Sequence, residues 1–136
     1  RYLEGVYPTP NLFGVDAFEQ GFIEMRNRQI ELELWSQIGT SWVNGPIVAK
    51  LGRFTQNPLA KEMSDKNVER YYRRLDDEFA AHAYVAGERY SVADISLLAA
   101  VNFAARLVAL QPSDELKHLW RWHSQVSARP AVQACL

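Results

Sequence analysis

The chain has 136 residues, 48% of them hydrophobic, and its 15 basic and 16 acidic residues leave a formal net charge of −1. This length suits one domain whose core buries about two thirds of the unfolded surface, and the near-neutral charge gives no electrostatic reason to expect a nucleic-acid partner. The single cysteine, Cys135, excludes an intrachain disulfide framework and favours a reducing, cytoplasmic setting.

The N-terminal segment has the features of a helix end followed by a linker. Residues 1–4 are typical of a helix that ends at Gly5, and the prolines of the YPTP run disfavour helix and favour extended backbone. Because the first residues have the pattern of a helix end, we expect another element to precede them. We therefore assign residues 1–14 to the end of that element with its linker, and residues 15–136 to a helical domain.

A long helix is predicted next. Asp16 and Glu19 have the spacing of a helix N-cap with its acidic partner, and apolar residues then recur every three or four positions until about Asn44. At 1.5 Å per residue this helix would be about 42 Å long. A Gly-Pro pair ends or kinks it, and the ambiguous stretch up to Met63 is predicted to be a short helix with a loop.

Two amphipathic helices are predicted in the second half of the chain. Ser64 can cap the first of them, and its basic run 70–74 lies beside the acidic run 76–78, which indicates a solvated, ion-paired face. The last helix opens at residues 112–113 and must end by Arg129, because a proline follows. The apolar face of the first of these helices is Val68, Tyr71, Tyr72, Leu75 and Phe79.

Residues 85–105 combine a turn at Gly87, a helix start and a nearly all-apolar helix. The Ser91 side chain can accept from the amide of Asp94, whose carboxylate can reach back to the Ser91 amide, so the two form a capping box. A helix that is apolar on nearly all sides belongs inside a bundle, and Arg106 ends the apolar run before it could span a membrane. We predict an all-α bundle of four to six helices around this central helix, with Ser91 and Asp94 in a structural role.

In this order the elements resemble the C-terminal helical domain of the cytosolic glutathione transferases. Four segments that together span the chain carry the resemblance: RYLE with YPTPNLFG, FIEMRNRQIELEL, VAGERYSVADISLLA, and RWHSQVSARPAVQACL. The first is similar to the end of the last helix of the family's thioredoxin-like N-terminal domain and the linker after it. The third is similar to the family's capping box and is the most specific of the four.

The resemblance implies conjugation or reduction of hydrophobic electrophiles, with glutathione as co-substrate and no metal. It implies a cytoplasmic homodimer that serves detoxification, in which the N-terminal domain holds glutathione and this domain binds the electrophile. The thiol-activating residue belongs to the N-terminal domain, so no catalytic residue is expected here. The alternatives are a non-catalytic protein-interaction domain, a role that such domains serve in translation factors and synthetase complexes, and a stand-alone domain with a small apolar pocket.

The resemblance also points to candidate site residues on the long helix. It places Glu31 near the γ-glutamyl amine of the glutathione bound to the neighbouring subunit, although Glu31 can also be solvated or pair with Arg28 or Arg26. Trp35, Ile38 and Trp42 share a face with Glu31 at spacings of four, three and four. We take them as the wall of the electrophile site, while a stripe at this spacing is also what core packing produces.

Two other kinds of site are not expected. His82, His118 and His123 lack metal-ligand spacing and a recognisable acidic or cysteine partner. No basic residue stands beside Cys135 in the sequence to activate the thiol, so we expect it to be inert.

Overall fold

The computed structural model describes residues 1–53 and 55–135, and within them the regular structure is helical apart from one isolated bridge between Tyr84 and Gly87. The all-α prediction is therefore confirmed. The elements are α1 (Tyr2–Val6), α2 (Ala17–Gln29), η1 (Ile30–Trp35), α3 (Ser36–Val43), α4 (Pro46–Ala49), α5 (Pro58–Ala81), α6 (Val92–Phe103), η2 (Ala104–Val108), α7 (Lys117–Ser127) and α8 (Pro130–Gln133).

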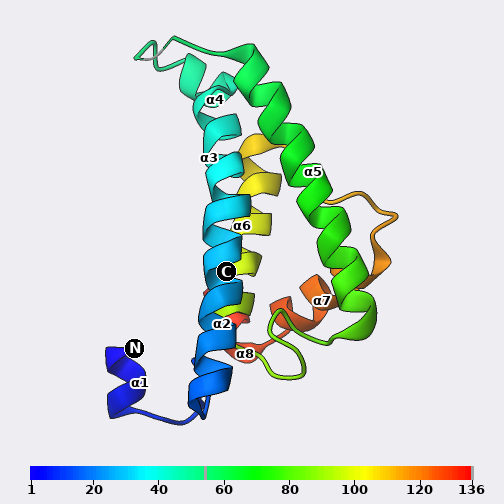
Figure 1. The fold of residues 1–136 in the computed structure, drawn as a ribbon. Helices are drawn as coiled ribbons and strands as arrows, with labels where there is room; N and C mark the ends of the chain where they lie inside the picture. The colour runs from blue at the N-terminus through cyan, green and yellow to red at the C-terminus, as the bar shows by residue number, and fades with distance from the viewer. Residues whose placement is uncertain (54, 136) are drawn as a thin grey trace.

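The predicted long helix is present as one rod made of α2, η1 and α3 (Figure 1). Asp16 caps it by accepting a hydrogen bond from the Glu19 amide at 2.8 Å, and the Glu19 carboxylate accepts from the Val15 amide at 2.8 Å. The rod ends at Val43, with Asn44 as its C-cap. Its middle six residues form a π-helix, which the apolar spacing did not predict because the helix continues on both sides.

The predicted start of the next helix was wrong. Helix α5 begins at Pro58, where Asn57 is the N-cap and accepts from the Ala60 amide at 3.1 Å, and Ser64 is buried inside the helix. Asn followed by Pro is a cap with a proline at the first helical position, although it can also be read as a helix breaker. The predicted apolar face of this helix is buried at all five positions.

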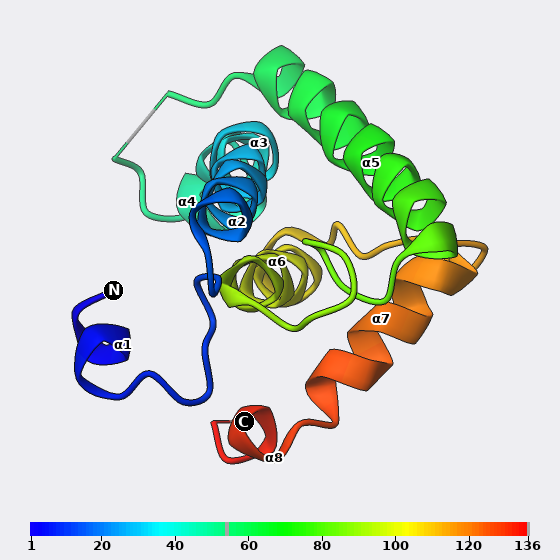
Figure 2. The ribbon, with the colours of Figure 1, turned by 60° about the horizontal axis from the view of Figure 1, so that its bottom comes forward.

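Helix α6 lies in the middle of the bundle, enclosed by the long helix, α5 and α7 (Figure 2). Its Leu97 and Val101 are buried, and beside it the rings of Phe79 and Trp122 stack with centroids 5.1 Å apart. The prediction of a central apolar helix is confirmed. Its polar Ser96 donates to Asn27 at 2.6 Å, so this side chain is satisfied within the bundle.

The C-terminal helix starts later than predicted and a further short helix follows it. Helix α7 begins at Lys117, because residues 109–116 form an irregular connection with a turn at residues 114–115, and it ends at Ser127. Pro130 then starts α8 instead of only ending α7. The described residues contain four long helical segments and three short ones. Without α1, six of them belong to the helical domain, within the predicted four to six, although α8 was not among the predicted elements.

The N-terminal segment folds back onto the start of α6. Helix α1 extends to Val6, past the predicted end at Gly5. The Glu4 carboxylate accepts from the amides of Leu12 and Phe13 at 2.7 and 3.2 Å, and the Val92 amide donates to the Leu12 carbonyl at 3.0 Å. The linker is thus hydrogen-bonded to the central helix.

The turn before α2 requires a glycine. Gly14 has φ of +105°, and a Cβ atom there would lie 2.6 Å from the Gln20 amide nitrogen. No helix among the described residues combines the length and the apolar character that a membrane crossing needs.

Candidate functional site

The capping box at the start of α6 is formed, and its acidic member collects four hydrogen bonds. Asp94 Oδ2 accepts from the Ser91 amide at 2.9 Å and from the Ser91 hydroxyl at 3.2 Å. Its Oδ1 accepts from the Val85 amide at 3.0 Å and from Trp122 Nε1 at 2.8 Å. Asp94 therefore ties α6 to the preceding loop and to α7.

The surroundings of Asp94 assign it to the scaffold. The side chain has no exposed surface, and this burial raises its pKa, while the hydrogen bonds from Val85, Trp122 and Ser91 act in the opposite direction. A carboxylate enclosed in this way has no access to a substrate proton. On the outer side of the same turn, the Arg129 guanidinium lies 3.7 Å from the centre of the Tyr90 ring.

The candidate residues on the long helix lie in different surroundings. Glu31 is half-buried and accepts from Arg28 at 2.6 Å and from Asn27 at 2.9 Å, so the arginine pairing considered for it is present. It lies 11 residues from Trp42, which is about 16 Å along a helix axis. The structure therefore does not bring Glu31 to the Trp42 end of the rod.

Trp35 and Trp42 meet at a third aromatic ring, which α6 supplies. Their ring centroids lie 5.5 and 5.9 Å from that of Phe103. Ile38, between the two tryptophans, is fully buried. It supports the aromatic cluster from behind instead of forming its surface.

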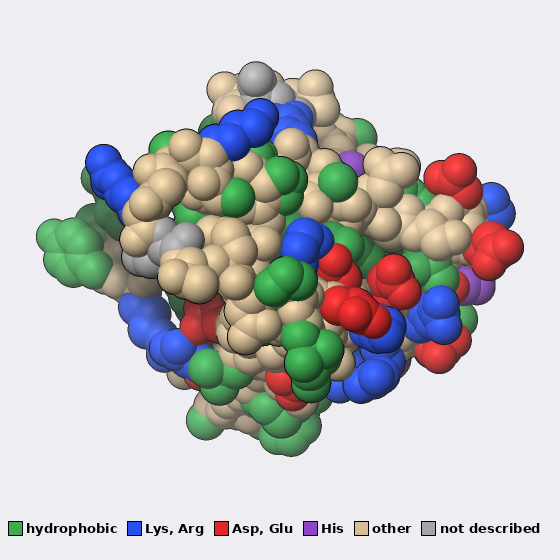
Figure 3. Space-filling model, turned by 90° about the horizontal axis from the view of Figure 1, so that it is seen from above, with side chains coloured by type: hydrophobic (Ala, Val, Ile, Leu, Met, Phe, Trp, Pro, Cys, Tyr) green, Lys and Arg blue, Asp and Glu red, His purple; other side chains and the backbone are tan. Residues whose placement is uncertain are grey.

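A pocket of about 200 Å³ opens next to this cluster, and we call it the Trp42 pocket. It lies between the end of α3, the short α4, the start of α5 and the η2 segment. It is lined by Trp42, Gly45, Pro46, Ile47, Lys61, Arg106, Leu107, Val108 and Ala109. Figure 3 views this end of the molecule and shows basic and apolar side chains side by side on its surface.

Two polar groups of the pocket differ in how they are held. Lys61 Nζ donates to Asp65 at 2.6 Å and to Ser41 at 3.3 Å, and the buried Ser41 hydroxyl also donates to Asp65. The indole nitrogen of Trp42 is buried and has no hydrogen-bond partner among the described residues. The lysine is thus fixed by its neighbours, while the indole N–H is enclosed without a partner.

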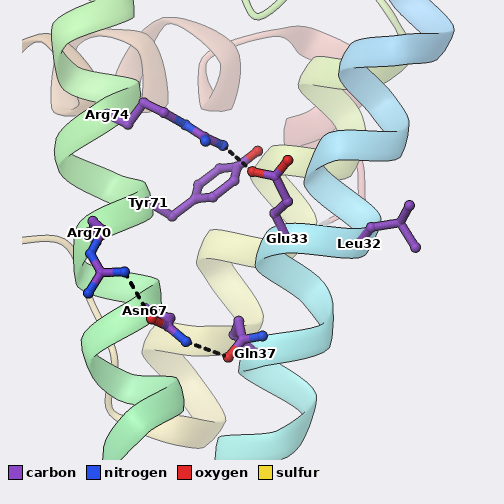
Figure 4. Close-up of a pocket in the computed structure, with 7 residues that line it drawn as sticks. All are labelled: Leu32, Glu33, Gln37, Asn67, Arg70, Tyr71 and Arg74. Atoms are coloured by element: carbon purple, nitrogen blue, oxygen red, sulfur yellow. Dashed lines mark hydrogen bonds and ion pairs between the residues drawn. The ribbon is translucent and has the colours of Figure 1, made fainter.

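A larger groove of about 350 Å³ runs between the long helix and α5 (Figure 4). Its charged groups pair with one another across the groove. Arg74 binds Glu33 at 2.6 Å and lies over the Tyr71 ring, and Asn67 donates to Gln37 at 3.1 Å. Of the basic run, Arg74 pairs with Glu33 and Glu78, while Arg70 donates to Asn67 of its own helix at 3.3 Å.

A metal site has no support among the described residues, which hold no group of three or more potential ligands. His123 lies 2.9 Å from the Asn102 side-chain oxygen, and burial lowers its pKa. Cys135 is exposed.

Sequence reasoning missed three residues of the aromatic cluster and the pocket, namely Phe103, Arg106 and Lys61. A signal for one of them existed, because Arg106 is the sole charged residue between Asp94 and Asp114. A charge alone in an apolar helix is a candidate for a binding role. Lys61 comes from another helix, so no local pattern connects it with Trp42.

The sequence matches the family model described as glutathione S-transferase, C-terminal domain, over residues 43–130. It is similar to glutathione S-transferase 2 of Saccharomyces cerevisiae, with 28% identity over 138 residues that cover 100% of this chain and 58% of that protein. The fold is similar to the crystal structure of Gtt2 from Saccharomyces cerevisiae, at a TM-score of 0.83 and 30% identity, covering 99% of this chain and 65% of that one.

A class Gtt2 glutathione S-transferase of Vibrio parahaemolyticus is similar as well, with a TM-score of 0.83, 26% identity, and coverage of 98% of this chain and 62% of that one. This chain spans less than two thirds of each of these three relatives. The matched model covers most of the chain, and the helical bundle agrees with the related structures. The chain therefore belongs to the glutathione S-transferase family and has the fold of its C-terminal domain.

Proposed function

We propose that this chain is the electrophile-binding domain of a cytoplasmic glutathione transferase that conjugates or reduces hydrophobic compounds and so serves detoxification. In this proposal residues 1–14 are the end of a thioredoxin-like domain and its linker, and residues 15–136 are the helical domain. The observation that carries it is the aromatic cluster of Trp35, Phe103 and Trp42 beside the Trp42 pocket. Apolar walls with a few polar groups are typical of small-molecule sites.

In this proposal the candidate residues of the long helix have different roles. Trp35 and Trp42 form the wall that contacts the electrophile, with Ile38 behind them. Glu31 approaches the amine of a glutathione molecule bound to the partner subunit, and the carboxylate is held for this by Arg28 and Asn27. The thiolate comes from glutathione, and its activating residue belongs to the N-terminal domain.

A homodimer fits the surface of the rod. Phe18, Phe22, Met25 and Leu32 are exposed large apolar side chains at helical spacing on α2 and η1. Phe18 and Phe22 stack with ring centroids 6.4 Å apart. A row of this kind is typical of a protein–protein contact, and the groove of Figure 4 runs along the same rod. We assign this side of the long helix and α5 to the contact with the partner copy.

The test uses the full-length protein. We expect it to be retained on immobilised glutathione and to conjugate a chromophoric aryl halide. Trp42→Ala should raise the KM for the aryl halide and leave the KM for glutathione nearly unchanged, because the indole lies in the electrophile pocket alone. Absence of both retention and turnover would overturn the enzyme proposal and favour a protein-interaction domain.

A further inference from the structure

The Trp42 pocket has the size of a single-ring ligand. Its volume is about 200 Å³, and a protein cavity of about 150 Å³ is enough to hold benzene. Trp42, Ile47, Leu107 and Val108 give it an apolar lining. A substituted aromatic ring therefore matches its volume and its walls.

Arg106 makes this pocket different from an ordinary apolar site. It lines the pocket, and among residues 1–53 and 55–135 it has no hydrogen-bond or ion-pair partner. Several other arginines are engaged, Arg26 with Glu78, Arg74 with Glu33, and Arg121 with the Phe79 carbonyl, whereas Arg73 is unpaired like Arg106 but lies outside the pocket. The Lys61 charge is balanced by Asp65, so Arg106 is the uncompensated charge of the pocket.

The Trp42 indole adds a donor without an acceptor. Its Nε1 is buried and unpaired among the described residues, which is unfavourable for a hydrogen-bond donor. The accessible donor of the pocket is the exposed Arg106 guanidinium. It has donors only, so it favours an acceptor-only group such as a carboxylate.

The backbone at the pocket is also irregular. Arg106, Leu107 and Val108 belong to the π-helix η2, and Ala109 follows it with φ of +60°. Ala109 is the single described non-glycine residue with positive φ. π-Helical turns and left-handed non-glycine residues are enriched at ligand sites, and here both present side chains to one cavity.

We propose that the Trp42 pocket selects electrophiles that combine one apolar ring with an anionic group, foremost an aryl carboxylate. This inference rests on the proposed transferase function and specifies its substrate class. The Arg106 guanidinium holds the carboxylate, and the ring lies against Trp42 and Leu107. With an aryl chloride, the glutathione thiolate attacks the carbon that bears chlorine, so the C–S bond forms, the C–Cl bond breaks, and chloride leaves with the bonding electrons.

The kinetic test compares chloronitrobenzoate with the matching chloronitrobenzamide, which keeps the ring and the chlorine but has no charge. We expect Arg106→Gln to lower kcat/KM for the carboxylate about fivefold, the upper range for an exposed ion pair, and to leave the carboxamide nearly unchanged. The ratio of the two substrates in wild type and variant cancels their intrinsic reactivities. Arg106→Lys, which keeps the charge, should retain most of the preference.

The matched control is Arg73→Gln, which removes an equal charge from an exposed position on α5 outside the Trp42 pocket. It should leave the substrate ratio unchanged. An equal loss in Arg73→Gln would show that long-range charge, and not the pocket, sets the preference. That result, or an unchanged ratio in Arg106→Gln, would overturn the proposal.

A binding measurement separates this inference from the transferase function. Nitrobenzoate, which has no leaving group, should shift the indole N–H resonance of Trp42, identified by its loss in Trp42→Phe, and bind more tightly than nitrobenzamide. Binding without any turnover would leave the pocket assignment standing and remove the transferase function. Turnover of aryl chlorides with no carboxylate preference and no shift of the Trp42 resonance would support the transferase function and overturn the pocket assignment.

Discussion

The polar groups at the two ends of helix α6 differ in whether they have hydrogen-bond partners. At the N-terminal end, the Asp94 carboxylate is buried and receives four hydrogen bonds, so every donor that faces it has an acceptor. At the C-terminal end, the Trp42 indole N–H is buried without a partner and Arg106 is unpaired among the described residues. Satisfied buried polar groups stabilise one arrangement of a fold. The exposed, unpaired Arg106 at the pocket is available to a ligand.

The polarity of a residue alone does not locate a catalytic or binding site. Asp94 is the most deeply buried charge of the chain and looks like a candidate general base by residue type. Its four hydrogen bonds argue against that role. The Trp42 indole N–H, in contrast, has no hydrogen-bond partner among the described residues. We therefore expect substitutions at the Asp94 end to lower mainly the stability, and substitutions at the Trp42 end to lower mainly ligand binding.

The largest effect is expected for Asp94→Ala. The change leaves the Trp122 indole N–H and the Val85 and Ser91 amides buried without an acceptor, so the free energy of unfolding should fall by about 3–4 kcal/mol. Urea titration followed by far-ultraviolet circular dichroism measures it. Asp114→Ala, at an exposed acidic position, should stay within about 0.5 kcal/mol of wild type. Equal losses in both variants would contradict the network.

The next largest effect is expected for Trp122→Phe. The phenyl ring keeps much of the stacking on Phe79 but cannot donate to Asp94, and a hydrogen bond to a charged group contributes about 1.5–3 kcal/mol. We expect a loss of about 2–3 kcal/mol with the smaller ring included. Addition of Trp122→Phe to Asp94→Ala should then cause less than the sum of the two losses, because both remove the same bond.

A smaller, pH-dependent effect is expected at His123. Burial lowers its pKa in the folded state below the ordinary value of 6.5, so below pH 6.5 the unfolded state binds more protons and stability falls as the pH decreases. Unfolding free energies measured from pH 7.5 down to pH 5.5 should show this slope in wild type. His123→Gln should flatten it, whereas His118→Gln, at an exposed histidine, should leave it intact.

The smallest stability effect is expected for Trp42→Phe, the counterpart of Trp122→Phe at the other end of α6. No hydrogen bond of the described residues is lost, so the free energy of unfolding should change by less than about 1 kcal/mol. The same urea titration compares the two variants directly. A loss as large as that of Trp122→Phe would mean that the Trp42 N–H has an acceptor within the folded protein, and the contrast between the two ends would disappear.

Much of the fold was predictable because its signals are local. The cap at Asp16, the capping box of Ser91 and Asp94, and the apolar face of α5 are read from residues three or four positions apart, which is the spacing at which helical side chains meet. The errors were local as well. Asn57-Pro58 has the pattern of a break but starts α5, whereas the proline at residue 130 follows the end of α7 as predicted and also starts α8.

The candidate site was predicted in part. Helical spacing placed Trp35, Ile38 and Trp42 on one face, and Trp35 and Trp42 do meet Phe103. Spacing could not tell which member of the face is solvent-accessible, because accessibility depends on the helix packed against it. Ile38 is covered in this way, and Glu31 lies too far along the rod to reach the pocket.

The sequence by itself determined the helical class, the central position of α6 and the family resemblance. Each can be recognised from residues that lie close together in the chain. The tertiary structure alone decided which polar groups find partners. Trp122 reaches Asp94 across 28 residues, while Trp42 and Arg106, 64 residues apart, line one cavity with no acceptor between them among the described residues. Hydrogen bonding is directional and short-ranged, so whether a buried group is satisfied is fixed when distant segments pack.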